Sequence, residues 1–286
     1  PFYSVFGTEK QIGNIPLGLC YIASVLEGEN HDVEILDCET LILGDKYDAG
    51  EMAYTHDLNV SYTKYAEVMG NANHPVWKKI ARLITKKNAD IIGFTTQTAT
   101  MSPVIHISKI LRKESDTKII LGGIHPTVLP ALSLEETGAD IAVIGEGERT
   151  IVELANGNEV DSINGIAYRK DSEICINKSR AFIEDLDTIP FPARHLLDRT
   201  KYKDTAFGYL ISSRGCPYNC CFCASKKMWG QRTRFRTAVN FVDEIEEVKL
   251  RYGTRLFRFT DDTFTLHKDR VLDFCREVKR RDLDIS

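Results

Sequence analysis

The sequence has no long apolar run, no strong excess of one charge and no low-complexity stretch. None of its segments approaches the roughly 18 consecutive apolar residues of a membrane-spanning helix, so we expect no membrane span. Its 37 basic and 41 acidic side chains give a net charge of −4, which is too mild to indicate a nucleic-acid partner. With 43% hydrophobic and 27% charged residues, the composition excludes a disordered chain, a collagen-like fibre and a small disulfide scaffold.

The chain is long enough for two domains, with 286 residues against roughly 150 in a typical domain. Residues 1–200 carry a net charge of −10 and residues 201–286 carry +6, which favours two modules with different roles. We expect one domain over residues 1–160, a hairpin and linker over 161–200, and the beginning of a second domain over 201–286.

Strand-like and helix-like patterns alternate along the first 155 residues. Apolar runs predict strands at residues 2–6, 33–37, 90–95, 118–123 and 139–144, and apolar stripes predict helices at 16–27, 74–87, 101–114, 129–136 and 148–156. Because parallel strands need a covering crossover of about a dozen residues, this alternation predicts an α/β fold with a doubly wound parallel sheet of about five strands. Ligands of such sheets bind beyond the carboxyl ends of the strands.

The pattern changes after residue 160. Two short strand-like runs flank Lys170-Asp171-Ser172 and predict a hairpin over 163–177. In the last module we expect strands at 207–212 and 256–260 and helices at 239–252 and 268–281. Two strand–helix units cannot close a barrel, and the chain starts with Pro1 rather than Met. We therefore expect sequence to be missing at both ends and the fragment alone to be inactive.

Four of the eight cysteines lie within residues 216–223. Such clustering indicates metal or redox chemistry in a reducing compartment rather than disulfide staples. Cys216, Cys220 and Cys223 form the pattern C-x3-C-x2-C, and three thiolates on one loop suit three irons of a four-iron cluster. The missing fourth ligand would leave one iron open to a substrate or cofactor.

A structural zinc site is the alternative for this loop. Zinc needs a fourth ligand, and Cys221 is awkwardly placed for it because it adjoins Cys220. Cys175 and Cys275 are distant in sequence and remain possible ligands. We interpret Cys221 as a packed thiol.

The cysteine spacing, Phe222 and the preceding strand resemble the radical S-adenosylmethionine superfamily. The resemblance implies that Cys216, Cys220 and Cys223 hold a [4Fe-4S] cluster and that Phe222 lies near the adenine of S-adenosylmethionine. In that superfamily the open iron binds S-adenosylmethionine, and one electron from the cluster releases a 5′-deoxyadenosyl radical. The resemblance also implies a ferredoxin or flavodoxin as reductant and, since oxygen destroys such clusters, an anaerobic cytoplasm.

Two charged features follow the cluster loop. The Asp261-Asp262 pair ends a predicted strand and resembles the pair that approaches S-adenosylmethionine in cobalamin-type radical enzymes, although an Asp there could also cap the next helix. A basic run without an acid suggests either a solvated face or compensation of a ligand's negative charge. Its members are Lys226, Lys227, Arg232, Arg234 and Arg236.

Three glycine-containing segments of the first domain, in order ahead of the cysteines, resemble the cobalamin-binding domain of that subfamily. They are Asn14–Leu19, Gly122–Thr127 and Gly145–Glu148. The residues that we expect to contact cobalamin are Thr95, Thr96, Gln97, Gly122, Gly123, His125, Gly145, Glu146 and Gly147. The D-x-H-x-x-G signature, which supplies a histidine to cobalt in other cobalamin proteins, is absent, so a domain that keeps the fold without cobalamin remains open.

The whole pattern therefore resembles a flavodoxin-like, Rossmann-type cobalamin domain followed by the truncated start of a partial (β/α) radical barrel. The nearest group is that of the anaerobic magnesium-protoporphyrin IX monomethyl ester cyclases. This resemblance implies methylation or oxidative cyclisation of an unactivated carbon in a small-molecule substrate. Two alternatives are a radical enzyme without cobalamin, such as a methylthiotransferase, and a non-enzymatic metal-binding module. Only Cys20 and Cys38 precede the hairpin, whereas methylthiotransferases carry three further cysteines there.

Overall fold

The computed structural model describes residues 13–42, 66–171 and 173–286. The chain divides into two compact units, which are described in turn. Of the described residues, the first unit holds 36–42, 66–144, 160–171 and 173–178, and the second holds 13–35, 145–159 and 179–286. The strand predicted at residues 2–6 lies outside the described residues.

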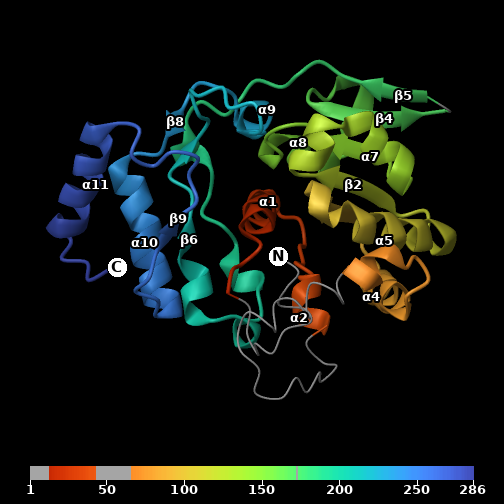
Figure 1. Cartoon of the computed structure of the whole chain (residues 1–286), viewed down its shortest axis with the longest axis horizontal. Helices are drawn as coiled ribbons and strands as arrows, with labels where there is room; N and C mark the ends of the chain where they lie inside the picture. Colours follow the sequence, from red (N-terminus) through yellow and green to blue (C-terminus); the bar gives the residue numbers. More distant parts are fainter. Residues whose placement is uncertain (1–12, 43–65, 172) are drawn as a thin grey trace. The chain divides into compact units, whose positions relative to one another are not determined.

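A five-stranded sheet forms the centre of the first unit (Figure 1). In spatial order its strands are β1 (Ile91–Thr95), β2 (Lys118–Gly122), β3 (Ile141–Val143), β4 (Ile166–Lys170) and β5 (Glu173–Ile176). The first three are parallel, and β4 and β5 continue the sheet with antiparallel pairing. The predicted hairpin is confirmed, and it extends the same sheet rather than standing apart.

The strand predicted at residues 33–37 is wrong, because no residue from 31 to 37 is in a strand. Val33 and Ile35 are more buried than Asp32 and Glu34, so the alternating pattern is present in the structure. Alternation is a local property, however, whereas a strand also needs a neighbour for its ladder of hydrogen bonds. The division between the two compact units falls directly after Ile35. Among the described residues the parallel part of the sheet therefore has three strands.

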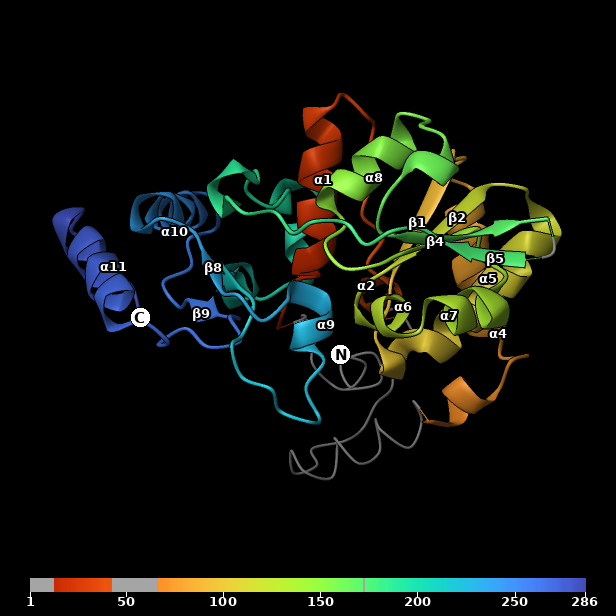
Figure 2. The same cartoon turned by 90° about the horizontal axis from the view of Figure 1, so that it is seen from above.

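Helices α5, α6 and α7 of the first unit lie on one side of its strands (Figure 2). The helices are α2 (Cys38–Ile42), α4 (Pro75–Thr85), α5 (Met101–Glu114), α6 (Ile124–Val128) and α7 (Pro130–Thr137). Trp77, Leu111, Leu121 and Leu134 form part of one buried apolar cluster that joins helices to the sheet. This burial, at about 25 cal/mol per Å² of apolar surface, holds the carboxyl ends of β1 and β2 in place.

The second unit contains two helix pairs and two very short strand pairs. Helix α1 (Leu17–Gly28) packs against α8 (Glu148–Ala155), and α10 (Ala238–Tyr252) packs against α11 (Lys268–Arg280). Strand β6 (Tyr209–Leu210) is parallel to β9 (Arg258–Phe259), and β7 (Ser213–Arg214) is antiparallel to β8 (Arg234–Phe235). The short helix α9 (Ser225–Trp229) follows the cysteines.

The strands predicted at 207–212 and 256–260 are therefore much shorter than expected. Residues Asp204–Gly208 form a 3-10 helix instead of the beginning of a strand. Beyond it, arginine side chains bind two backbone carbonyls: Arg194 donates to Tyr209 O at 2.9 Å and Arg236 to Ile211 O at 3.2 Å. Side chains thus take hydrogen bonds that a longer ladder would have made.

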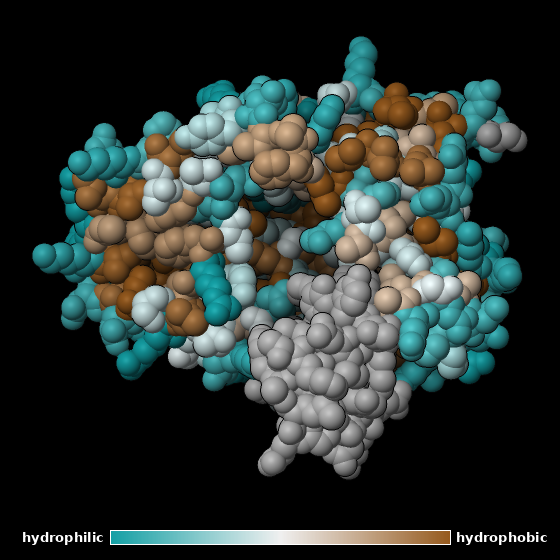
Figure 3. Space-filling model, viewed as in Figure 1, coloured by the Kyte–Doolittle hydropathy of each residue, from teal (hydrophilic) through white to brown (hydrophobic). Residues whose placement is uncertain are grey.

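Apolar side chains also reach the surface of the second unit. Figure 3 shows them gathered over the region where α11 and β9 lie. A hollow of about 550 Å³ is lined there by Phe274, Val278, Leu283 and Ile285, among others. Across residues 13–42, 66–171 and 173–286, no helix combines the length and apolarity needed to cross a bilayer.

Candidate functional site

The cysteine loop is closed at its base by the β7–β8 pair. Arg214 lies opposite Arg234 in this pair, and Cys216 N donates to Gly230 O at 3.4 Å. Gly215 has φ +97°, and a Cβ there would lie 2.4 Å from Arg232 O. Only glycine combines that conformation with so close a backbone approach. The sequence Arg-Gly-Cys thus turns the chain sharply into the loop.

The three predicted ligands lie on this one loop, and none of them is in a disulfide. Cys216 is half-buried with Sγ 3.7 Å from Thr263 Oγ1, whereas Cys220 and Cys223 are exposed. The N–H of Cys223 donates to Cys220 O at 3.1 Å, which closes a turn around Cys221. In the described segments no three Cys, His, Asp or Glu side chains converge as a ready ligand set. The loop's donor set nevertheless fits an iron–sulfur cluster, because it offers the three predicted thiols, with Cys221 beside them, and no Asp, Glu or His side chain.

The aspartate pair is engaged with the protein rather than with open space. Asp261 Oδ1 accepts from the N–H groups of Ser212 and Ser213 at 2.8 and 2.6 Å. Asp262 accepts from the hydroxyl of Ser225, at the start of α9. Asp261 therefore holds the segment before the cysteines in place, and Asp262 holds the segment after them. Phe222, on the loop itself, is 89% exposed. Contacts of these three residues with S-adenosylmethionine stay predictions.

The basic run divides into two groups with different environments. Lys226, Lys227 and Arg232 are exposed, as a solvated face predicts. Arg234 and Arg236 are buried among protein carboxylates. Arg234 and Arg236 are two residues apart, so an extended chain turns both side chains to the same face. Arg232 precedes β8 (Arg234–Phe235) and is exposed.

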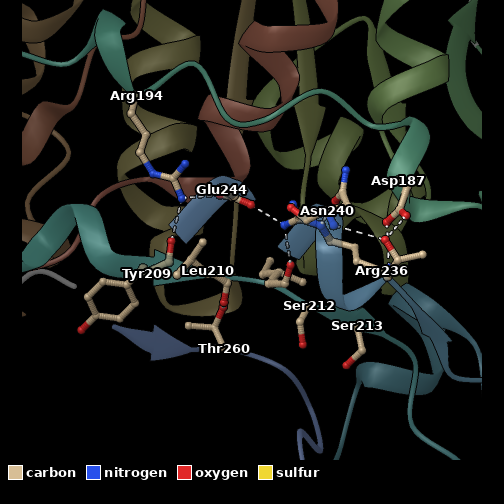
Figure 4. A network of polar contacts seen from close by, with 12 residues as sticks. Asp187, Arg194, Tyr209, Leu210, Ser212, Ser213, Arg236, Asn240, Glu244 and Thr260 are labelled. Carbon is tan, nitrogen blue, oxygen red and sulfur yellow. Dashed lines mark hydrogen bonds and ion pairs between the residues drawn. The ribbon is translucent and has the colours of Figure 1, made fainter. Parts of the chain in front are cut away.

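Glu244 lies between Arg194 and Arg236 in a buried network that the sequence analysis missed (Figure 4). Its side chain is fully buried, with Oε1 2.6 Å from Arg194 Nη2 and Oε2 bonded to Arg236 Nη1. Asn240 Oδ1 accepts from Arg236 Nε at 2.6 Å. The sequence offered one sign that this carboxylate is buried: Glu244 lies on the apolar stripe of α10, beside Phe241 and Val248.

A second buried network contains Glu146, which was predicted to contact cobalamin. Its carboxylate binds Arg214 and Arg234, and Glu148 Oε1 binds Arg214 Nη2 at 2.5 Å. Burial alone disfavours the charged guanidinium of Arg214, but Glu148 and Glu146 outweigh it and raise the pKa of that group. Gly145 and Gly147 flank Glu146 in the second unit.

The loops after β1 and β2 are joined in the first unit. Thr96 N donates to Gly122 O at 2.7 Å, and His125 N donates to Thr96 O at 3.3 Å. Thr96 is buried, whereas Thr95 and Gln97 are exposed. The structure thus brings together the predicted residues 95–97 and 122–125 at the carboxyl edge of the parallel strands.

His125 supplies the feature of these loops that points most directly to a ligand. Its ring is buried, with Nδ1 3.1 Å from Thr98 Oγ1, while Nε2 is buried without a partner. Buried polar atoms are normally hydrogen-bonded. An unpaired buried ring nitrogen, on a loop that begins with Gly122 and Gly123, is compatible with a large cofactor that approaches the backbone. The contacts of these loops with cobalamin stay predictions.

We expect Gly123→Ala to destabilise the protein by about 1–3 kcal/mol because its backbone conformation strongly disfavours a side chain. Gly123 has φ +104°, and a Cβ would lie 2.6 Å from Thr96 O. Gly122→Ala is the matched control, since its Cβ would meet nothing within 4 Å. The control should change stability by no more than about 1 kcal/mol. Urea midpoints of the two full-length variants test this, and equal shifts would contradict it.

Two family models match the chain. Residues 13–155 match the B12 binding domain, and residues 210–286 match the radical SAM superfamily. The chain belongs to the cobalamin-binding radical SAM proteins. This confirms the resemblance drawn from the cysteine loop and the glycine-containing segments.

Curated relatives of this cobalamin-binding radical SAM protein are named as enzymes. It is 33% identical to an uncharacterized methyltransferase of Pyrococcus horikoshii, over 95% of this chain and 54% of the relative. It is 28% identical to cytidylyl-2-hydroxyethylphosphonate methyltransferase of Streptomyces wedmorensis, over 92% of this chain and 54% of the relative. It is 29% identical to an anaerobic magnesium-protoporphyrin IX monomethyl ester cyclase of Rubrivivax gelatinosus, over 78% of this chain and 42% of the relative. The chain thus spans about half the length of these relatives.

Two solved structures share the fold. The cobalamin-dependent S-adenosylmethionine radical enzyme OxsB, with aqua-cobalamin bound, matches 96% of this chain and 36% of its own with a TM-score of 0.69 and 20% identity. The radical S-adenosylmethionine methyltransferase TsrM of Kitasatospora setae, with cobalamin and a [4Fe-4S] cluster bound, matches 94% of this chain and 48% of its own with a TM-score of 0.66 and 18% identity. These likenesses confirm the mixed α/β fold with a parallel sheet.

Proposed function

We propose that this chain is part of a cobalamin-dependent radical S-adenosylmethionine enzyme that methylates or oxidatively cyclises an unactivated carbon of a small-molecule substrate. The observation that carries the proposal is the C-x3-C-x2-C loop, closed by β7 and β8, in a chain whose residues 13–155 belong to the B12 binding family. When bound, the cluster and S-adenosylmethionine supply a 5′-deoxyadenosyl radical, and cobalamin supplies methyl transfer or one-electron chemistry.

The residues of this chain have separate tasks in the proposal. Cys216, Cys220 and Cys223 hold the cluster, while Phe222 contributes an apolar surface for the adenine. Asp261 fixes the backbone of Ser212 and Ser213 ahead of the loop. In the first unit, the segments 95–97 and 122–125 hold cobalamin, and the absence of a side chain at Gly123 leaves their backbones in contact.

We also propose a setting for this enzyme. Exposed thiols such as Cys220 and Cys223 would hold an oxygen-sensitive cluster, which requires an anaerobic cytoplasm. A ferredoxin or flavodoxin would supply the electron. Residues 1–162 contain only Cys20 and Cys38, and Cys20 is fully buried in α1, so this stretch does not supply the three cysteine ligands of a second methylthiotransferase cluster.

The metal content of the full-length protein tests the proposal. The protein is purified without oxygen, supplied with cobalamin, iron and sulfide, and analysed for iron and cobalt per chain. We expect about four irons, as in one four-iron cluster, together with one cobalt. Adding S-adenosylmethionine should change the electron paramagnetic resonance spectrum of the reduced cluster. Iron without cobalt would overturn the cobalamin part, and zinc without iron would overturn the radical chemistry.

A further inference from the structure

The carboxylate of Glu146 is completely occupied by protein donors. Oε1 accepts from Arg214 Nη1 and Arg234 Nη1, both at 2.9 Å. Oε2 accepts from Arg234 Nη1 at 2.9 Å and from Ile183 N at 2.7 Å. The residue is 5% exposed. Its lone pairs are therefore directed at the segments around the cysteine loop and are not available to an outside ligand.

The two arginines need this carboxylate because they face each other across β7 and β8. Arg214 and Arg234 are partners in the strand register, and both are 4% exposed. Like charges directly opposite one another on a strand pair are destabilising, and a buried charge is costly without a partner. Glu146, which touches both, and Glu148, which touches Arg214, balance two positive charges with two negative ones.

The network contains residues on both sides of the cysteine loop. Arg214 lies two residues before Cys216, and its guanidinium stacks on Trp229 with 4.7 Å to the ring centroid. Arg234 lies after the loop and donates to Trp229 O at 3.0 Å. Between these anchors, Cys216 N binds Gly230 O. The position of the first cysteine therefore depends on residues that Glu146 holds.

We propose that Glu146 is a positioning residue for the iron–sulfur cluster: its buried carboxylate, from the region matched by the B12 binding family, holds Arg214 and Arg234 and thereby places Cys216. This inference rests on the proposed function. It replaces the expected contact between Glu146 and cobalamin with a contact to the cluster loop. A change at Glu146 then alters the cluster and leaves the binding of cobalamin to the first unit unchanged.

The test compares Glu146→Gln with Glu153→Gln in the full-length protein, reconstituted without oxygen. Glu153 is the matched control, since it lies on α8 and pairs with Arg180, away from the cysteine loop. Substitutions behind metal ligands commonly cost about 10–100-fold in metal affinity or activity. We expect a loss of that size in iron retention for Glu146→Gln, with an altered cluster spectrum per remaining iron. The affinity for cobalamin, measured by absorbance titration, should be unchanged, and Glu153→Gln should resemble wild type.

A second variant separates charge balance from folding. In the double variant Glu146→Gln/Arg234→Gln, the buried Arg214 keeps the buried Glu148 as its partner, and the charges balance again. Iron retention should therefore rise above that of the single variant Glu146→Gln. An unchanged cluster spectrum despite lower thermal stability would overturn the inference, as would weaker cobalamin binding with a normal cluster. No gain in the double variant would also overturn it. A wild-type protein that takes up no iron would instead overturn the proposed function, and the inference with it.

Discussion

Replacing Cys216 with alanine is expected to remove the iron–sulfur cluster and, with it, all cleavage of S-adenosylmethionine. Each thiolate of a three-cysteine loop holds one iron, so two remaining thiolates cannot retain the cluster. Iron per chain should fall by at least about tenfold, the scale on which lost metal contacts act. Iron analysis of the full-length variant, together with the spectrum of the reduced cluster, measures this.

The control for this experiment is the neighbouring residue Cys221. It is exposed rather than packed, and like Cys220 and Cys223 it is not in a disulfide, but it lies inside the turn closed by the hydrogen bond from Cys223 N to Cys220 O. Cys221→Ala should therefore keep wild-type iron. Equal iron loss in Cys221→Ala and Cys216→Ala would show that the ligand assignment is wrong and would revive Cys221 as a ligand.

Removing the charge of Glu244 is expected to destabilise the second unit strongly. Glu244 is fully buried between Arg194 and Arg236 (Figure 4). Breaking a buried ion pair from one side typically costs about 3–5 kcal/mol, because the other charge stays buried without a partner. In Glu244→Gln two arginines lose their partner together, and the carbonyls of Tyr209 and Ile211 lose positioned donors.

Urea unfolding of full-length Glu244→Gln measures this effect, with Glu247→Gln as the control. Glu247 lies on the same helix and forms an exposed pair with Arg251 at 3.3 Å. Exposed pairs contribute only about 0–1 kcal/mol, so the control should unfold close to wild type. A Glu244 variant as stable as the Glu247 variant would mean that the buried network does not stabilise this unit.

The regular elements of the first unit could be predicted because their signals are local. The helix predicted over 101–114 agrees with α5 (Met101–Glu114), and the predicted runs at 90–95 and 118–123 contain β1 and β2. Periodicity and turn residues are enough for such elements. The absence of a strand at 33–37 was not predictable in the same way. The alternation there carries no information on which neighbouring strand, if any, would pair with this segment.

The residues of the candidate site likewise divide into those that a local signal predicts and those that it does not. The cysteine spacing identified the loop that would hold the cluster, because ligand type and spacing belong to one short segment. The partners of Asp261 and Glu146 were missed because they are distant in the chain. Those of Asp261 are 48 to 49 residues away, and those of Glu146 are 37 to 88 residues away. Nothing near Glu146 in the sequence distinguishes a carboxylate that contacts a cofactor from one that holds two arginines.

By itself, the sequence determined the family, the α/β character, the longer helices and the three thiols suited to a cluster. The tertiary structure alone decided which charges are buried, so that Arg232 faces water while Arg234 and Arg236 are enclosed. It also decided that the hairpin extends the parallel sheet. The physical reason is that periodicity and ligand spacing act over a few residues, whereas the cost of a buried charge depends on distant segments that only folding brings into contact.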